Sequence, residues 1–164
     1  MKTSKIYYLF SAIIILLVIF YFYQKYNVAP RIDMNTIAVI NENNEPVDFT
    51  QYKGKKVIIS FYASWCPNCL DELKTLNQLY SSKLSDITIL CITDEPMDKL
   101  ISFRDKKQYP FTFLKLTKSF PEIGINSIPT TYLLNTNNQM VYENVGYIEW
   151  DDESTLNHLK TLMN

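Results

Sequence analysis

The chain opens with a continuous run of hydrophobic residues. Residues 6–23, IYYLFSAIIILLVIFYFY, contain no charged residue, proline or glycine. As a helix this run would be about 27 Å long, close to the hydrocarbon thickness of a bilayer, which is about 30 Å. Tyrosines stand near both of its ends, as in the aromatic belts of membrane proteins. The pattern predicts an N-terminal membrane anchor over residues 1–23, with about 6–23 in contact with lipid.

A buried core helix and a cleaved signal peptide are the alternatives to an anchor. The apolar region of a signal peptide is shorter, about 7–15 residues, and ends at small residues. Nothing near residues 21–30 resembles such a cleavage site, so an uncleaved anchor is favoured. Lys2 and Lys5 precede the run and Lys25 and Arg31 follow it. The positive-inside rule therefore favours a cytoplasmic N-terminus only slightly.

After a polar segment at residues 24–35, which we predict to be a short tether, the hydrophobic pattern changes. From residue 36, short β-like runs alternate with helical periodicity, which predicts a single α/β domain over residues 36–164. The expected strands are 37–40 and 47–49 as a hairpin, then 57–63, 87–93, 111–116, 130–135 and 139–145. The expected helices are 66–83, 94–107 and 151–163, with a helical turn near 118–123.

Composition narrows the range of functions. The chain has 164 residues, 47% of them hydrophobic, which suffices for one domain with a sizeable core. Its formal charge is −1, and no Lys/Arg cluster is interleaved with aromatic residues. This is not the pattern of a nucleic-acid-binding protein, so we expect no nucleic acid partner.

The most informative motif is the pair of cysteines in SFYASWCPNCLDEL, residues 60–73. Cys66 falls between a predicted central strand and a predicted helix, whose free N–H groups and dipole stabilise a thiolate. Pro67 suits the first turn of that helix, where its missing N–H is not needed. The spacing allows Cys69 to resolve a mixed disulfide on Cys66 and to close an intramolecular disulfide.

A structural disulfide and a zinc site are the other interpretations of this pair. A permanent disulfide here would close a very short loop and remove little entropy from the unfolded chain. A zinc site needs four ligands, and only Cys91 and His158 remain to complete one. We expect Cys91 to be a small core residue and His158 to lie on a helix surface, with no metal site. A redox-active pair is the favoured interpretation.

Two motifs carry a family resemblance. FYASWCPNC resembles the active-site strand and helix start of the thioredoxin superfamily. SIPTTYLL, residues 127–134, resembles its second motif, in which a cis-proline faces the disulfide and which Pro129 matches. The apolar N-terminal segment, EPVDFTQYKGKKVIISFYASWC, and Glu72, three residues after Cys69, are similar to the membrane-anchored TlpA/ResA-like thiol-disulfide oxidoreductases. The resemblance covers nearly all of residues 36–164.

This resemblance implies a thioredoxin-like sandwich, a central mixed β-sheet flanked by helices, with an N-terminal β-hairpin extension. It implies a single-pass protein of the cytoplasmic membrane with its catalytic domain on the extracytoplasmic, or periplasmic, side. Such a domain needs no cofactor beyond its own disulfide. Its partners would be envelope protein thiols and disulfides, including apocytochrome c before haem attachment, and a membrane electron donor would re-reduce it.

The same resemblance assigns roles to individual residues. Cys66 would be the nucleophile, Cys69 the resolving thiol and Glu72 a proton-handling acid. The substrate-binding residues would be Trp65, Pro67, Asn68, Ile128, Pro129 and Thr130.

Three positions depart from the pattern. Ser60 stands where thioredoxins usually carry a buried acid, and Lys74 replaces a common helix proline. The dipeptide Pro67-Asn68 lacks the histidine found in strongly oxidising members, which favours a reductant.

Two alternative functions share the fold. A thiol peroxidase needs Thr or Ser three residues before its reactive cysteine, where this chain has Ala63. A copper-chaperone-like binding protein normally separates its cysteines by three residues and adds a well-placed histidine, and the sequence shows neither. The sequence therefore favours an oxidoreductase over both.

Overall fold

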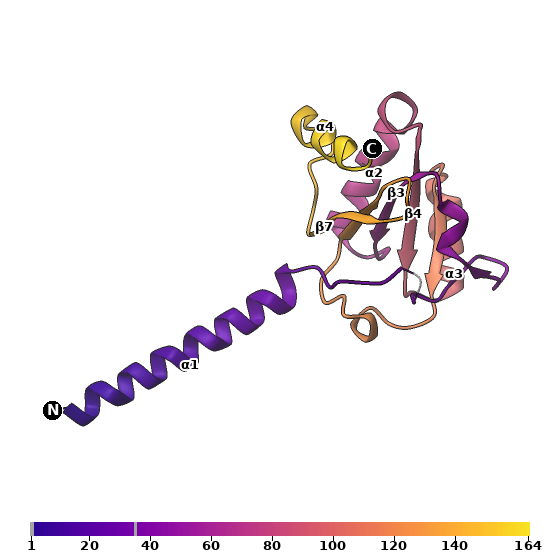
Figure 1. Cartoon of the computed structure of the whole chain (residues 1–164). Coiled ribbons are helices and arrows are strands. Elements are labelled where there is room, and N and C mark those ends of the chain that lie inside the picture. The colour runs from indigo at the N-terminus through magenta and orange to yellow at the C-terminus, as the bar shows by residue number, and fades with distance from the viewer. Residues whose placement is uncertain (1, 35) are drawn as a thin grey trace.

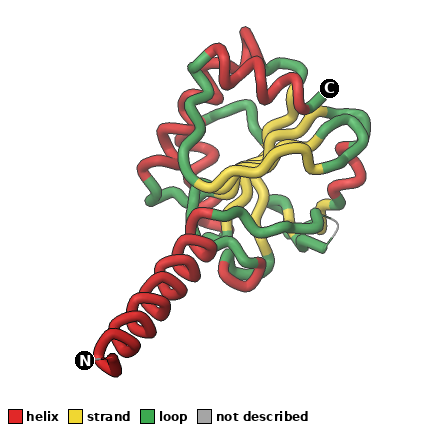
Figure 2. Tube along the Cα trace, turned by 60° about the vertical axis from the view of Figure 1, so that its left-hand side comes forward, coloured by secondary structure: helices red, strands yellow, loops and turns green. Residues whose placement is uncertain are grey.

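The computed structural model describes residues 2–34 and 36–164. A long helix, α1 (Lys2–Asn27), precedes a compact α/β domain (Figure 1). Within α1, the segment Tyr7–Asn27 is long and apolar enough to cross a membrane. The helix continues past residue 23, where the predicted span ends. In both Figure 1 and Figure 2 the domain lies beyond the C-terminal end of α1, which leaves the sides of the helix uncovered.

A mixed sheet of seven strands forms the centre of the domain. The strands are β1 (Val39–Ile40), β2 (Pro46–Val47), β3 (Lys56–Phe61), β4 (Ile87–Thr93), β5 (Thr112–Leu116), β6 (Thr130–Leu134) and β7 (Met140–Val145). Their order in the sheet is β2-β1-β5-β4-β3-β6-β7. β3, β4 and β5 are parallel, whereas β1, β2, β6 and β7 pair antiparallel to their neighbours. The predicted mixed sheet is confirmed.

Three helices pack on one face of this sheet. They are α2 (Pro67–Lys83), α3 (Met97–Lys107) and α4 (Glu153–Leu162). Their buried side chains form one apolar cluster with the sheet; its members include Leu73, Leu76, Leu100, Phe103, Leu156, Leu159, Ile58 and Leu133. Asp152 caps α4 by accepting a hydrogen bond from the backbone N–H of Thr155. The acids predicted at the start of the last helix therefore stand where they stabilise it.

The opposite face is covered by short segments instead of long helices. Two 3₁₀ turns, Phe49–Tyr52 and Pro121–Ile123, lie in this layer with residues from the stretch after α1. Ala29 and Met34 are buried there, and the hydroxyl of Tyr132 donates a hydrogen bond of 2.8 Å to the carbonyl of Pro30. Residues 24–35, predicted to be a tether, thus include a segment that packs on the domain.

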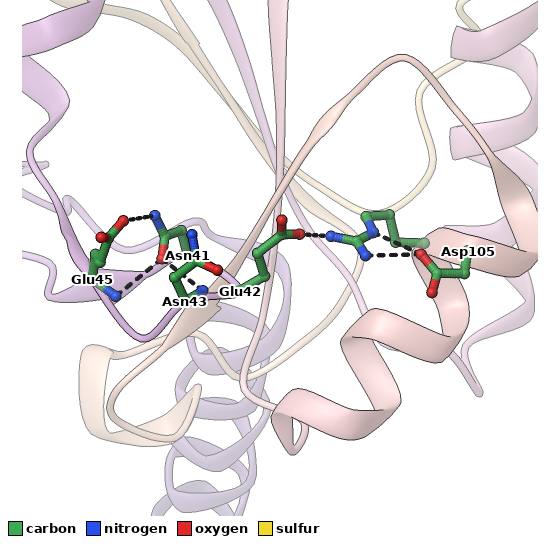
Figure 3. Close-up of polar contacts among 6 residues, drawn as sticks. Asn41, Glu42, Asn43, Glu45 and Asp105 are labelled. Carbon is green, nitrogen blue, oxygen red and sulfur yellow. Dashed lines mark hydrogen bonds and ion pairs between the residues drawn. The ribbon is translucent and has the colours of Figure 1, made fainter.

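The N-terminal hairpin is fixed at its tip by polar contacts (Figure 3). The side-chain oxygen of Asn41 accepts hydrogen bonds from the backbone N–H groups of Asn43 and Glu45, at 2.9 and 3.0 Å. An ion pair joins Glu42 to Arg104 of α3. The turn-rich cluster that predicted this hairpin therefore also links it to a helix far along the chain.

The start of α3 differs from the prediction. The sequence placed Asp94 and Glu95 in the first turn of a helix, but α3 begins at Met97. A residue that precedes a proline is disfavoured in helical conformation, and Pro96 follows these acids directly. Asp94 instead accepts a hydrogen bond from the backbone N–H of Phe120, and Glu95 accepts from the backbone and hydroxyl of Ser64.

The packing of α2 gives a stability test. Leu76 of α2 is fully buried in the apolar cluster between the helices and the sheet. We therefore expect Leu76→Ala to lower the free energy of unfolding by about 2–5 kcal/mol. Lys74→Ala on the exposed side of the same helix should change it by less than about 0.5 kcal/mol. Urea unfolding of the full chain in detergent measures both. Equal losses in the two variants would contradict the packing described for α2.

Candidate active site

Cys66 lies at the junction between β3 and α2. It is the N-cap residue of α2, with extended backbone geometry, and Pro67 is the first residue of the helix. The two cysteines form a disulfide with their Cα atoms 5.3 Å apart. Cys66 is 5% exposed and Cys69 is fully buried. The sulfur of Cys66 is therefore the one that a partner can reach.

The start of α2 favours negative charge on this sulfur. The backbone N–H of Cys69 donates a hydrogen bond of 3.2 Å to the Cys66 sulfur, and the first turn contains no acidic residue. Free N–H groups and the helix dipole both stabilise an anion at this position. In the reduced protein, the thiolate of Cys66 is thus favoured over that of an exposed cysteine.

A loop from the other side of the sheet completes the site. The Ile128-Pro129 peptide bond is cis, and the Ile128 carbonyl oxygen lies 3.9 Å from the Cys66 sulfur. The hydroxyl of Thr130 donates to the carbonyl of Ser127 at 2.7 Å, which holds the loop. The structure therefore brings the WCPNC segment and the Ile-Pro-Thr segment together, although about sixty residues separate them in the sequence.

The remaining predicted contact residues surround the disulfide. Trp65 is 72% exposed, and Pro67 and Asn68 are also exposed. Trp65 and Ile128 line a groove of about 420 Å³ whose floor includes Phe120 and Ile125. The groove offers a largely apolar surface next to Trp65, the residue that precedes Cys66.

Glu72 lies beneath the cysteines in the interior. It is fully buried, and its Oε1 accepts hydrogen bonds from the Thr131 hydroxyl at 3.0 Å and the Trp150 indole N–H at 3.2 Å. Burial raises the pKa of Glu72 to about 7, while hydrogen bonds from Trp150 and Thr131, and a smaller contribution from the backbone of Ile148, oppose the rise. A carboxyl group with this pKa can exchange a proton near neutral pH.

Ser60 lies on β3 beside Thr131, the residue of β6 whose hydroxyl donates a hydrogen bond to Glu72. It is paired with Thr131 on β6 and with Cys91 on β4. Burial, and then the charge of Glu72, raise the pKa of Cys91, whose side chain is fully buried. The sequence did not predict Thr131 or Trp150 as site residues. Thr131 directly follows the Ile-Pro-Thr motif, but no local signal marks Trp150, which lies 78 residues from Glu72.

His158 lies on α4, and its side chain is exposed. Among residues 2–34 and 36–164, no cluster of three His, Cys, Asp or Glu side chains forms a metal site. The structure thus gathers the dithiol, Glu72 and the cis-proline loop at one place, and it leaves His158 outside.

Comparison with known proteins agrees with this geometry. The model of the Redoxin family matches residues 28–160. The chain belongs to the Redoxin family. Sporulation thiol-disulfide oxidoreductase A of Bacillus subtilis is 27% identical over 114 residues, which are 62% of this chain and 69% of that protein. Thiol-disulfide oxidoreductase ResA of Bacillus thuringiensis is 24% identical over 66% of this chain and 65% of its own length.

Solved structures show the same fold. A thiol:disulfide interchange protein DsbE from Chlorobium tepidum aligns with a TM-score of 0.63 and 18% identity, over 82% of this chain and 99% of that one. The resemblance to the thioredoxin superfamily and its TlpA/ResA-like members is thereby confirmed. The curated relatives are matched over 49% to 69% of their own lengths.

The buried carboxyl of Glu72 makes the stability of the Redoxin domain depend on pH. Between about pH 4.5 and 7, the folded protein keeps a proton on Glu72 that the unfolded chain has lost. The contribution of Glu72 to the free energy of unfolding is therefore fully present below about pH 4.5. It decreases as the pH rises to about 7, and the total decrease is about 3 kcal/mol. We expect Glu72→Gln to flatten this fall.

Urea unfolding of the oxidised protein at about pH 5 and about pH 8 measures the effect. Asp71→Asn, an exposed position on the same helix, is the matched control and should retain the fall. A wild-type profile no steeper than that of Glu72→Gln would contradict the assignment.

Proposed function

We propose that this protein is a membrane-anchored thiol-disulfide oxidoreductase that reduces disulfides in partner proteins of the cell envelope. The observation that carries the proposal is the Cys66–Cys69 disulfide at the N-terminus of α2, in contact with the cis Ile128-Pro129 loop. Relatives whose names describe thiol-disulfide oxidoreductases support it.

The first step is attack by the Cys66 thiolate on one sulfur of the partner disulfide. A mixed disulfide forms, and the other partner sulfur leaves as a thiolate that takes a proton from water. The partner chain next to its cysteine would lie extended along the Ile128 backbone, in the manner of an added strand. The apolar groove beside Trp65 would receive one of its side chains.

The second step is resolution by Cys69. Its thiol loses a proton to the Glu72 carboxylate, and the resulting thiolate attacks the Cys66 sulfur. The intramolecular disulfide closes, and the second partner sulfur is released as a thiol after taking a proton. Two electrons pass from this protein to its partner. A membrane dithiol donor would then return the Cys66–Cys69 pair to the reduced form.

The direction of transfer and the location are the finer parts of the proposal. The dipeptide Pro67-Asn68 supplies no histidine to stabilise the thiolate further, which favours a reductant. The apolar helix Tyr7–Asn27 supports a single-pass anchor, and the slight charge bias favours an extracytoplasmic domain. Reduction of apocytochrome c before haem attachment is one envelope reaction that this chemistry would serve.

Variants of the three cysteines separate the proposed roles. We expect Cys66→Ser to abolish reduction of a disulfide-bonded model protein, because the attacking thiolate is lost. Cys69→Ser should still attack and should accumulate mixed disulfides, which non-reducing electrophoresis detects. Cys91→Ala, which changes a thiol buried in β4, should retain turnover and serves as the matched control.

Undiminished turnover by Cys66→Ser would contradict the mechanism. So would a Cys69→Ser variant that forms no mixed disulfide while remaining folded.

A further inference from the structure

The short segment after α1, residues 28–34, is fixed to the domain. Only Val28 and Ala29 separate the end of α1 at Asn27 from Pro30. The Pro30 carbonyl accepts the hydrogen bond from Tyr132, and a Cβ atom at Gly124 would lie 3.2 Å from the Pro30 ring. Ala29 is also buried. The connection between α1 and the domain is thus too short and too well packed to act as a flexible linker.

The end of α1 lies beside the active site. Lys25 and Tyr26 line the same groove as Trp65 and Ile128. The Ile128 carbonyl oxygen is in turn 3.9 Å from the Cys66 sulfur. The face that carries the reactive disulfide therefore continues directly into the last turn of the helix predicted to cross the membrane.

The exposed aromatic side chain on this face suits a membrane interface. Within residues 36–164, the large hydrophobic side chains that are exposed are Trp65 and Tyr147. A span of Tyr7–Asn27 places Lys25 and Tyr26 at the bilayer surface, where tryptophan, tyrosine and lysine side chains are favoured. Because Trp65 lines the same groove as these two residues, it lies near this end of the span. Figures 1 and 2 show that the domain lies beyond the C-terminal end of α1, so the residues beside that helix end are the ones nearest to the proposed bilayer.

We propose that residues 28–34 hold the active-site face against the surface of the membrane that α1 crosses. The protein then acts on partner disulfides that lie at that surface, in membrane-tethered proteins or in chains bound to the bilayer. Disulfides in freely diffusing proteins are reached less readily. This inference rests on the proposed membrane anchoring and thiol-disulfide exchange, and it adds the class of partner.

The two tryptophans of the chain offer a direct test of the orientation. Trp65 is exposed, whereas Trp150 is buried, and the sequence contains no other tryptophan. The full-length protein, reduced to remove quenching by its own disulfide, is placed in phosphatidylcholine vesicles whose acyl chains carry bromine near the headgroup. We expect these lipids to quench the tryptophan fluorescence, and we expect Trp65→Phe to lose at least half of that quenching.

An insertion variant is the matched control. About 12 Gly and Ser residues placed between Asn27 and Val28 add roughly 20 Å to the distance that the connection can span. They leave residues 28–34 and their packing unchanged. Quenching should fall in this variant to the level of Trp65→Phe. Equal quenching in the wild type, Trp65→Phe and the insertion variant would overturn the proposed orientation.

A substrate assay tests the consequence for partners. A fluorogenic peptide with an internal disulfide is attached to vesicle lipids through a short or a long flexible spacer. We expect the wild type to reduce the short-spacer peptide at least about threefold faster than the long-spacer one, and the insertion variant to lose or reverse this preference.

The free peptide keeps the two proposals separate. Equal reduction of the free peptide by both proteins shows that disulfide exchange is intact. The same spacer dependence in both proteins, with intact exchange on the free peptide, would overturn the surface-bound partner class alone. Failure to reduce any of the peptides would instead contradict the proposed function.

Discussion

The contact between the N-terminus of α2 and the cis-proline loop at the Cys66 sulfur is the constraint on which the structure depends. The backbone N–H of Cys69 and the carbonyl of Ile128 both lie close to this sulfur. The first contact stabilises a thiolate and the second leaves an extended backbone edge beside it. β3 and β6 are paired neighbours in the sheet, and this pairing sets the two segments at one end of the domain.

The buried carboxyl of Glu72 is the second distinctive element of the site. Burial disfavours the charged form of a carboxyl group and so raises its pKa. The hydrogen bonds from Trp150 and Thr131 offset only part of this rise for Glu72. Carboxyl groups with a strongly raised pKa are found most often at functional sites. Glu72 lies one helical turn after Cys69 on α2. Ser60 stands in the sheet where thioredoxins usually carry their acid. If this protein keeps a proton-handling acid, the proposed one is Glu72 on the helix instead of a residue on the strand.

Much of this arrangement was predictable from the sequence, because its signals are local. β4 was predicted with its observed bounds, since a short apolar run that is buried on both sides is typical of a central strand. The cysteine pair was recognisable by its spacing and context, and the Ile-Pro-Thr segment became informative in combination with it. The helix start predicted at Asp94 was wrong because Pro96 disfavours helical conformation at the residue before it, so α3 begins at Met97. The partners of Glu72 and the packing of Ala29, Pro30 and Met34 depend on contacts between distant segments, which no local pattern reveals.

The central claim is that the Cys66–Cys69 pair transfers electrons to partner disulfides. The reduction potential of this pair tests it most directly, measured in the full-length protein by alkylation after equilibration with thiol-disulfide buffers of known potential. We expect a value near that of thioredoxin, about −270 mV. A value near −120 mV, typical of a strong oxidant, would contradict it.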